Sequence, residues 1–111
     1  MTRRQEPEPV LLGSLEEQVM LAVVRTGANA YGMNVRRELE SVTGREITIG
    51  SVYATLDRLE AKGFVTSARS AATDAPSRRI FSVTTPGALS LELTRDTRDR
   101  LWMGVTLKLK S

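Results

Sequence analysis

Hydrophobic side chains recur at helical spacing in the first part of the chain and predict a mostly buried helix over residues 14–26. Ser14 followed by Glu17 has the form of a capping box, which places the start of the helix at Ser14. Gly27 is expected to end it. The apolar sector of this helix comprises Leu15, Val19, Leu21, Ala22, Val23 and Val24.

The next two segments also have helical periodicity. Val35, Leu39 and Val42 share one face of a second helix, which Gly44 is expected to end. A short extended link follows. Either Thr48 or Ser51 then caps a third helix, and Gly63 is expected to end it.

The pattern changes after residue 63 from helical spacing to two strand-like runs, residues 64–70 and 78–84. The intervening segment, 71–77, is polar and rich in turn-forming residues, so the two runs predict a hairpin with a long tip. Thr84 or Thr85 then caps a last helix, with Pro86 at its first position, that extends to about residue 103. Residues 105–110 alternate apolar and cationic side chains like an edge strand, and whether residues 104–111 are helical stays open.

The order of elements indicates an α+β fold that is mainly α: a winged helix-turn-helix of three helices and a two-stranded wing, followed by a C-terminal dimerisation helix. Residues 1–11, polar and broken by prolines, are expected to form a flexible N-terminal arm. Residues 12–84 form the winged helix-turn-helix, and residues 85–111 form the dimerisation helix and tail.

Composition narrows the classes of function. The 111 residues carry a net charge of +3, which slightly favours a polyanionic partner, and they include no cysteine and no histidine. The usual general base and the commonest metal ligands are therefore missing, so we expect neither an enzyme nor a metal or cofactor site. No apolar run approaches the ~20 residues of a membrane span, and we expect a cytoplasmic protein without a membrane partner.

One face of the third helix carries unusually small side chains. Val52, Leu56 and Leu59 form its core stripe, so the neighbouring strip should be exposed. Small and hydroxyl-bearing residues let a helix backbone approach base edges in the DNA major groove, whereas a plain solvated face usually carries longer Glu and Lys side chains. The predicted DNA-contacting residues of this helix are Thr48, Ser51, Ala54, Thr55, Arg58 and Lys62.

Further candidates flank this helix. Arg69, Arg78 and Arg79 border the hairpin tip, where they are expected to contact phosphates or the minor groove, although solubility and protection of a sheet edge also explain them. Tyr31 and Tyr53, at the starts of the second and third helices, are either phosphate contacts or packing residues whose hydroxyls reach a backbone partner.

Three motifs in the chain resemble those of the PadR-type regulators: Tyr-Gly at residues 31–32, "GSVYATLDRLEAKG" at residues 50–63, and "VTTPG" at residues 83–87. The resemblance covers residues 12–103. It implies a homodimeric winged-helix transcription factor, usually a repressor, that binds a pseudo-palindromic operator through its third helix and wing. It also implies that the C-terminal helix packs against its twin.

The apolar residues late in that last helix are therefore the expected subunit interface: Leu93, Leu101, Trp102 and Val105. Trp102 either packs between the subunits or lines a pocket at the dimer seam for a planar, apolar effector, as aromatics of this helix do in some members of the similar family. The expected partners are thus double-stranded DNA, a second copy of the chain and such an effector. The alternative is a winged-helix adaptor that binds proteins and no specific DNA.

Overall fold

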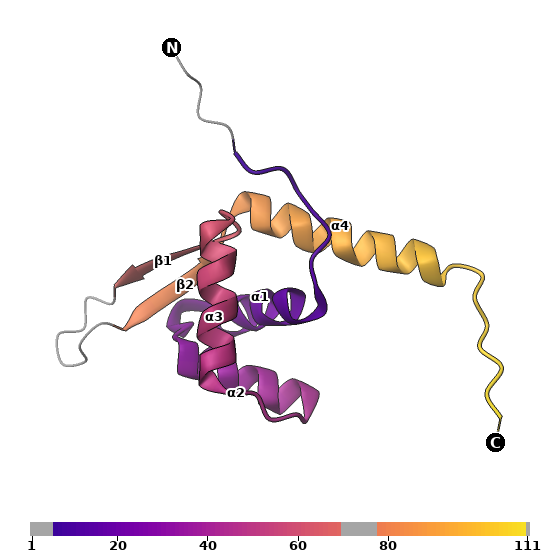
Figure 1. Cartoon of the computed structure of the whole chain (residues 1–111), viewed down its shortest axis with the longest axis horizontal. Coiled ribbons are helices and arrows are strands. Elements are labelled where there is room, and N and C mark those ends of the chain that lie inside the picture. The colour runs from indigo at the N-terminus through magenta and orange to yellow at the C-terminus, as the bar shows by residue number, and fades with distance from the viewer. Residues whose placement is uncertain (1–5, 70–77, 111) are drawn as a thin grey trace, which may run out of the picture.

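The computed structural model describes residues 6–69 and 78–110 and has the predicted order of elements (Figure 1). Three helices, α1 (Ser14–Thr26), α2 (Gly32–Thr43) and α3 (Ile49–Ala61), precede a hairpin of β1 (Val65–Arg69) and β2 (Arg79–Val83). A last helix, α4 (Thr85–Trp102), follows the hairpin, and a short 3₁₀ helix, η1 (Gly27–Asn29), links α1 to α2. The prediction of a mainly helical winged helix-turn-helix is confirmed.

Most helix ends lie where the sequence places them. Gly27, Gly44 and Gly63 follow the three helices with positive φ angles of 71°, 69° and 83°. Helix α1 begins at Ser14 as predicted, but its N-cap is Gly13, whose N–H donates to Glu16 Oε1 at 3.1 Å. The predicted capping box of Ser14 with Glu17 is therefore wrong. Glu17 instead accepts hydrogen bonds from Arg98 of α4, at 2.8 and 2.9 Å.

The core lies where α1, α2 and α3 meet the hairpin. Apolar side chains from every one of these elements are buried there, among them Val19, Met20, Val35, Val52, Leu56, Leu59, Phe64, Val65 and Phe81. Three residues predicted to face inward, Leu21, Val24 and Val42, are exposed instead. They line an apolar groove of about 320 Å³ between α1 and α2. Because α4 leaves the body of the molecule, nothing in the described part of the chain covers this side.

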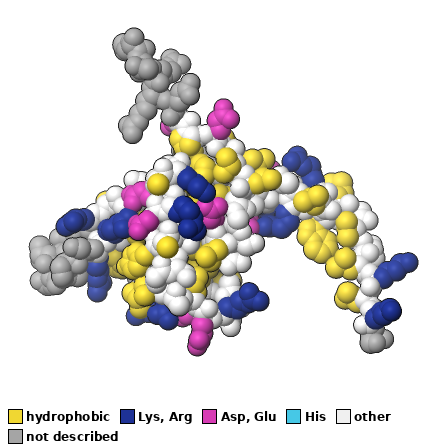
Figure 2. All heavy atoms as spheres, in the orientation of Figure 1, with side chains coloured by type: hydrophobic (Ala, Val, Ile, Leu, Met, Phe, Trp, Pro, Cys, Tyr) yellow, Lys and Arg dark blue, Asp and Glu magenta, His cyan; other side chains and the backbone are white. Residues whose placement is uncertain are grey.

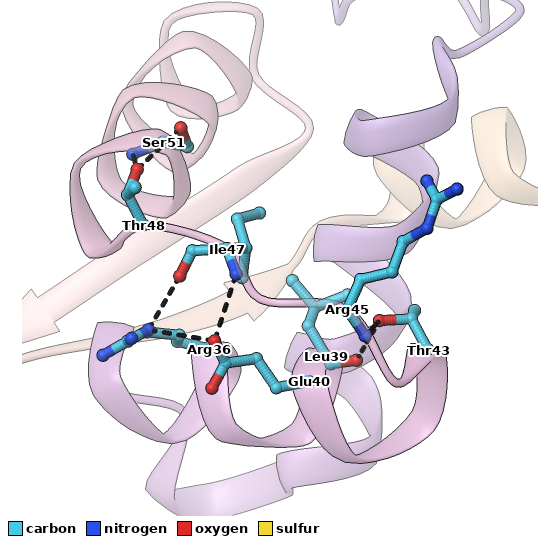
Figure 3. Close-up of polar contacts among 8 residues, drawn as sticks. All are labelled: Arg36, Leu39, Glu40, Thr43, Arg45, Ile47, Thr48 and Ser51. Atoms are coloured by element: carbon cyan, nitrogen blue, oxygen red, sulfur yellow. Dashed lines mark hydrogen bonds and ion pairs between the residues drawn. The ribbon is translucent and has the colours of Figure 1, made fainter.

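The turn between α2 and α3 is held by side chains of α2 (Figure 3). Arg36 Nε donates to the Ile47 carbonyl at 2.8 Å, and the Ile47 N–H donates to Glu40 Oε2 at 3.0 Å. Thr48, not Ser51, is the N-cap of α3, because its Oγ1 accepts from the Ser51 N–H at 3.1 Å. These bonds fix the direction in which α3 leaves the turn.

The hairpin is antiparallel, with Val65 opposite Val83 and Arg69 opposite Arg79. Its inner face carries Val65 and Phe81, which are buried in the core. The Phe81 N–H also donates to the Ala30 carbonyl at 3.0 Å, which ties β2 to the link between α1 and α2.

The start of α4 packs closely against the end of α3. Thr84 caps α4 by accepting from the Gly87 N–H at 3.1 Å, and its hydroxyl donates to the Gly63 carbonyl at 2.7 Å. A Cβ atom at Gly87 would lie 2.1 Å from the Phe64 carbonyl oxygen, so only glycine permits this approach. From there α4 projects away from the three-helix body (Figure 1).

The segment before α1 contacts α4 where the expected N-terminal arm joins the winged helix-turn-helix. Residues 1–5 lie outside the described residues, but residues 10–12 run along α4. The Val10 N–H donates to Ser90 Oγ at 3.1 Å, and the Leu12 N–H donates to Thr94 Oγ1 at 3.0 Å. Leu12 is also buried. Two hydroxyl acceptors on α4, which no local sequence pattern reveals, therefore hold residues 10–12 against that helix.

The C-terminal segment after α4 is neither helical nor part of a sheet over residues 105–110. No helix in the described part of the chain is long and apolar enough to cross a membrane.

Candidate nucleic-acid interface

One face of α3 is uncovered along the length of the helix (Figure 1). Ser51, Ala54, Arg58 and Lys62 are exposed, as the sequence predicts, and Gly50 extends the face at its N-terminal end. The side chains in the first half of this face are short. The backbone of α3 can therefore approach a partner closely over that half.

Thr55 was predicted to lie on this face, and that prediction is wrong. Its side chain is only 1% exposed. Thr55 is adjacent to the stripe of Leu56 and Leu59, and α3 packs against both α1 and α2, so the buried sector is wider than the apolar stripe alone. Tyr53 borders the exposed face on the side away from Thr55, and its side chain is exposed.

A hollow of about 290 Å³ lies where the start of α2 meets α3 and the wing. Tyr31, the N-cap residue of α2, contributes to its wall, and the Arg78 guanidinium lies 5.0 Å from the centre of the Tyr31 ring. The remaining residues that line it are Met33, Asn34, Arg37, Tyr53 and Arg79. The hollow thus brings the two predicted tyrosines together with Arg78, and it adds Arg37.

Gly32 makes this arrangement possible. A Cβ atom at Gly32 would lie 2.4 Å from Cζ of Tyr53. The Tyr-Gly pair therefore lets the Tyr53 ring lie directly on the first turn of α2, which positions its hydroxyl at the hollow.

Arg79 differs from the other predicted contacts because two carboxylates pair with its charge. Its Nη1 lies 3.0 Å from Asp57 Oδ1, and its Nη2 lies 2.6 Å from Glu60 Oε1. The guanidinium also stacks on Phe81, 4.8 Å from the ring centre. Arg79 therefore joins the wing to α3 in this conformation, and its contact with DNA stays a prediction.

Arg58 and Lys62 are also close to an acidic residue. Glu16 Oε2 lies 2.8 Å from Lys62 Nζ and 3.9 Å from Arg58 Nε. The hydrogen bond from Lys62 lowers the pKa of Glu16, against the opposing effect of partial burial. Unlike Arg79, both cations remain about half exposed and can reach a partner.

Charges over α3 and the wing are consequently mixed and do not form one continuous basic surface (Figure 2). Arg69 is exposed at the end of β1, next to the tip of the hairpin. The tip itself, residues 70–77, lies outside the described residues. Arg69, Arg78 and Arg37 are therefore the exposed cations that border the α3 face from the wing and from α2.

Three of the residues predicted for the subunit interface lie at the far end of α4 or just after it, and the fourth, Leu93, lies in the middle of the helix. Leu101 is 74% exposed and Trp102 is 54% exposed, and Val105 is exposed as well. Hydrophobic side chains continue along the tail, as Figure 2 shows. Leu93 is half-buried.

Sequence reasoning did not single out Glu16, Arg37, Asp57 or Glu60. Arg37 could have been found, because it lies off the apolar face of the second helix near the Tyr-Gly motif. Asp57 and Glu60 lie on the side of α3 that faces the wing, which becomes visible only once the hairpin is placed. Glu16 meets Lys62 across 46 residues, and no local pattern signals such a contact. In the described part of the chain, no three acidic, histidine or cysteine side chains cluster as metal ligands would.

The fold and the exposed α3 define a winged-helix protein. Residues 20–93, more than half of the chain, match the model of the transcriptional regulator PadR-like family. The chain therefore belongs to this family, which consists of transcriptional regulators and not of enzymes. A search of curated protein sequences finds no significant match.

Solved structures with the same fold include a PadR-like transcription factor from Bacteroides fragilis, with 22% identity and a TM-score of 0.69 over 78% of this chain and 82% of that one. A PadR-like transcriptional regulator from Bacillus cereus has 19% identity and a TM-score of 0.66, covering 80% and 84%. A winged-helix DNA-binding protein from STIV has 16% identity and a TM-score of 0.65, covering 86% and 99%.

Proposed function

We propose that this protein is a sequence-specific DNA-binding transcriptional regulator that acts as a repressor. The observation that carries the proposal is the exposed first half of α3, where Gly50, Ser51 and Ala54 leave the helix backbone uncovered. A helix of this kind fits the major groove, because short side chains allow close contact with base edges. Membership of a family of transcriptional regulators supports the same conclusion.

The roles of the residues follow from their positions. The Ala54 methyl group can contact a thymine methyl, and the Ser51 hydroxyl can bond to a base or a phosphate. Arg58 and Lys62, further along α3, reach the phosphates that border the groove. Tyr31, Tyr53 and Arg78 would contact the phosphate backbone from the hollow beside α3, and Arg69 would contact it from the wing.

The protein would bind its operator as a homodimer. Leu101, Trp102 and Val105 form an apolar surface at the far end of α4 that a second copy can cover by two-fold symmetry. A two-fold dimer presents two α3 helices to two half-sites, which requires a pseudo-palindromic operator.

A small effector is a further part of the proposal. Trp102 is the only tryptophan and is about half exposed, so two copies at the dimer seam could hold a planar, apolar molecule between them. A planar aromatic dye should gain fluorescence with the wild-type protein and not with Trp102→Ala. An equal gain with both proteins would contradict an effector site at Trp102.

The decisive experiment changes the face of α3 without disturbing the core. Ala54→Glu places a charged side chain at the expected groove contact, on an exposed helical position. Ala88→Glu makes the same change on an exposed position of α4 and serves as the control. Fluorescence anisotropy with DNA from upstream of the protein's own gene should show a loss of at least about tenfold for Ala54→Glu, the size of one lost base contact.

The control variant should retain wild-type affinity for that DNA. Wild-type protein that prefers no sequence over random duplex DNA would contradict sequence-specific regulation. Equal, sequence-specific binding by Ala54→Glu and wild type would contradict the assignment of base contacts to α3, and an absence of any sequence preference in the wild type would favour the alternative of a winged-helix adaptor.

A further inference from the structure

The carboxylate of Glu16 lies on the edge of the α3 face and is nearly covered by the cations it contacts. Its side chain is 14% exposed, whereas those of Arg58 and Lys62 are 54% and 44% exposed. Both cations approach the same oxygen, Oε2, from different positions along α3. One acidic group from the start of α1 therefore faces the two cations in the second half of the α3 face.

The position of this carboxylate is fixed by the backbone. Oε1 accepts the hydrogen bond from the Gly13 N–H that caps α1, so the group cannot turn away without losing the cap. Glu16 is thus a stationary anion at a site where a DNA phosphate would otherwise be the natural partner of Arg58 and Lys62.

We propose that Glu16 competes with DNA phosphates for Arg58 and Lys62 and thereby lowers the affinity for DNA of any sequence. Phosphate contacts carry no sequence information, whereas contacts to base edges do. Weakening the phosphate contacts in the second half of α3 reduces non-specific binding and leaves base reading by Ser51 and Ala54 unchanged. Glu16 is then a determinant of overall affinity for DNA that touches no base.

The ion pairs of Glu16 with Arg58 and Lys62 lower the affinity for phosphate, but a phosphate can still replace the carboxylate. Partly exposed ion pairs are weak, so a phosphate can replace Glu16 as the partner of these cations at small cost. The Arg58 contact, at 3.9 Å, is longer than that of Lys62, at 2.8 Å. Arg58 is therefore the cation that a phosphate captures more easily.

The inference rests on the proposed function, and Glu16→Gln tests it. The amide oxygen of glutamine can still accept from the Gly13 N–H, but the negative charge is gone. Glu92→Gln is the matched control, because it makes the same change in net charge on an exposed residue of α4 that has no ion pair within the described residues.

Affinity for a random duplex is measured by fluorescence anisotropy between about 50 and 200 mM salt. Glu16→Gln should bind random DNA about 3- to 10-fold more tightly than wild type, with the slope of log affinity against log salt steeper by about 1–2. Because the gain is shared by DNA of every sequence, the ratio of operator affinity to random-DNA affinity should stay within about twofold of wild type. Glu92→Gln should stay within about twofold of wild type. Equal behaviour of the two variants would overturn the inference.

A second comparison separates competition from a change in folding. In the Glu16→Gln background, Arg58→Gln combined with Lys62→Gln should abolish the gain in affinity, since the released cations cause it. Persistence of the gain would overturn the inference.

If wild-type protein binds no duplex at any salt concentration, the proposed function fails and this inference fails with it. A wild-type protein that binds DNA while Glu16→Gln binds it unchanged leaves the proposed function standing and removes only the inference.

Discussion

At the scale of single residues, the carboxylate of Glu16 serves the fold and the α3 face at once. One oxygen caps α1 through Gly13, and the other holds Lys62, which lies at the end of α3. The side chain therefore links the start of α1 to the end of α3, which are far apart in sequence. Because the ion pair with Lys62 needs the ionised carboxylate, it should make the free energy of unfolding depend on pH.

Acidification should destabilise the wild-type protein more than Glu16→Gln. The folded-state pKa of Glu16 lies below its ordinary value of 4.5, so its contribution to stability is complete above about pH 4.5 and disappears as the pH falls through the lower folded-state value. Urea unfolding at about pH 7 and about pH 3 measures the loss for each protein. The other carboxyl groups titrate in both proteins and cancel in the comparison. Equal losses would show that the ion pairs do not stabilise the fold.

At the scale of elements, the wing is attached to α3 by polar contacts as well as by the core. Arg79 on β2 reaches Asp57 and Glu60 on α3, and Glu60 also accepts from Ser67 Oγ on β1 at 2.7 Å. The hairpin is only two strands wide, and such a hairpin is marginally stable by itself. These contacts should therefore set the angle between the wing and α3.

Replacing Arg79 by methionine keeps the packing on Phe81 and removes both ion pairs. We expect the free energy of unfolding to fall by about 1 kcal/mol, because the pairs are partly exposed. Amide hydrogen exchange should accelerate in residues 65–69 and 79–83 and stay unchanged in α1. Arg78→Met alters the exposed neighbour and should leave exchange in the wing at the wild-type rate. Identical exchange in the two variants would contradict the role of Arg79 as the link between wing and helix.

At the scale of the whole molecule, the two ends of α4 have opposite characters. The first turns are buried against Phe64 and α1, where Gly87 and Ser90 are covered. The far end and the tail expose apolar side chains in a chain of only 111 residues. Burying such a surface between two copies would stabilise a small fold that has a modest core of its own.

Leu101→Glu should convert a dimer into a monomer. Leu101 is too exposed for the change to disturb the fold of one chain, but a charge in an apolar interface is costly. Light scattering after gel filtration should give twice the chain mass of 12.2 kDa for the wild type and a single chain mass for the variant. Trp102 emission should shift to longer wavelength in the variant. Ser41→Glu on α2 should remain dimeric, and a monomeric wild type would contradict the proposed interface.

The sequence by itself determined the elements, because periodicity, capping residues and glycines act over a few residues. Val52, Leu56 and Leu59 marked the inner side of α3, Thr84 or Thr85 marked the start of α4, and the three motifs indicated the family. Only the tertiary structure decided that Thr55 is buried and which charges α3 pairs. Thr55 is buried because the packing of α3 covers more of the helix than its apolar stripe, and Arg79 is paired because the wing folds back onto α3. Glu16 meets Lys62 across 46 residues. Contacts of this length depend on how helices pack, and packing leaves no periodic trace in the local sequence.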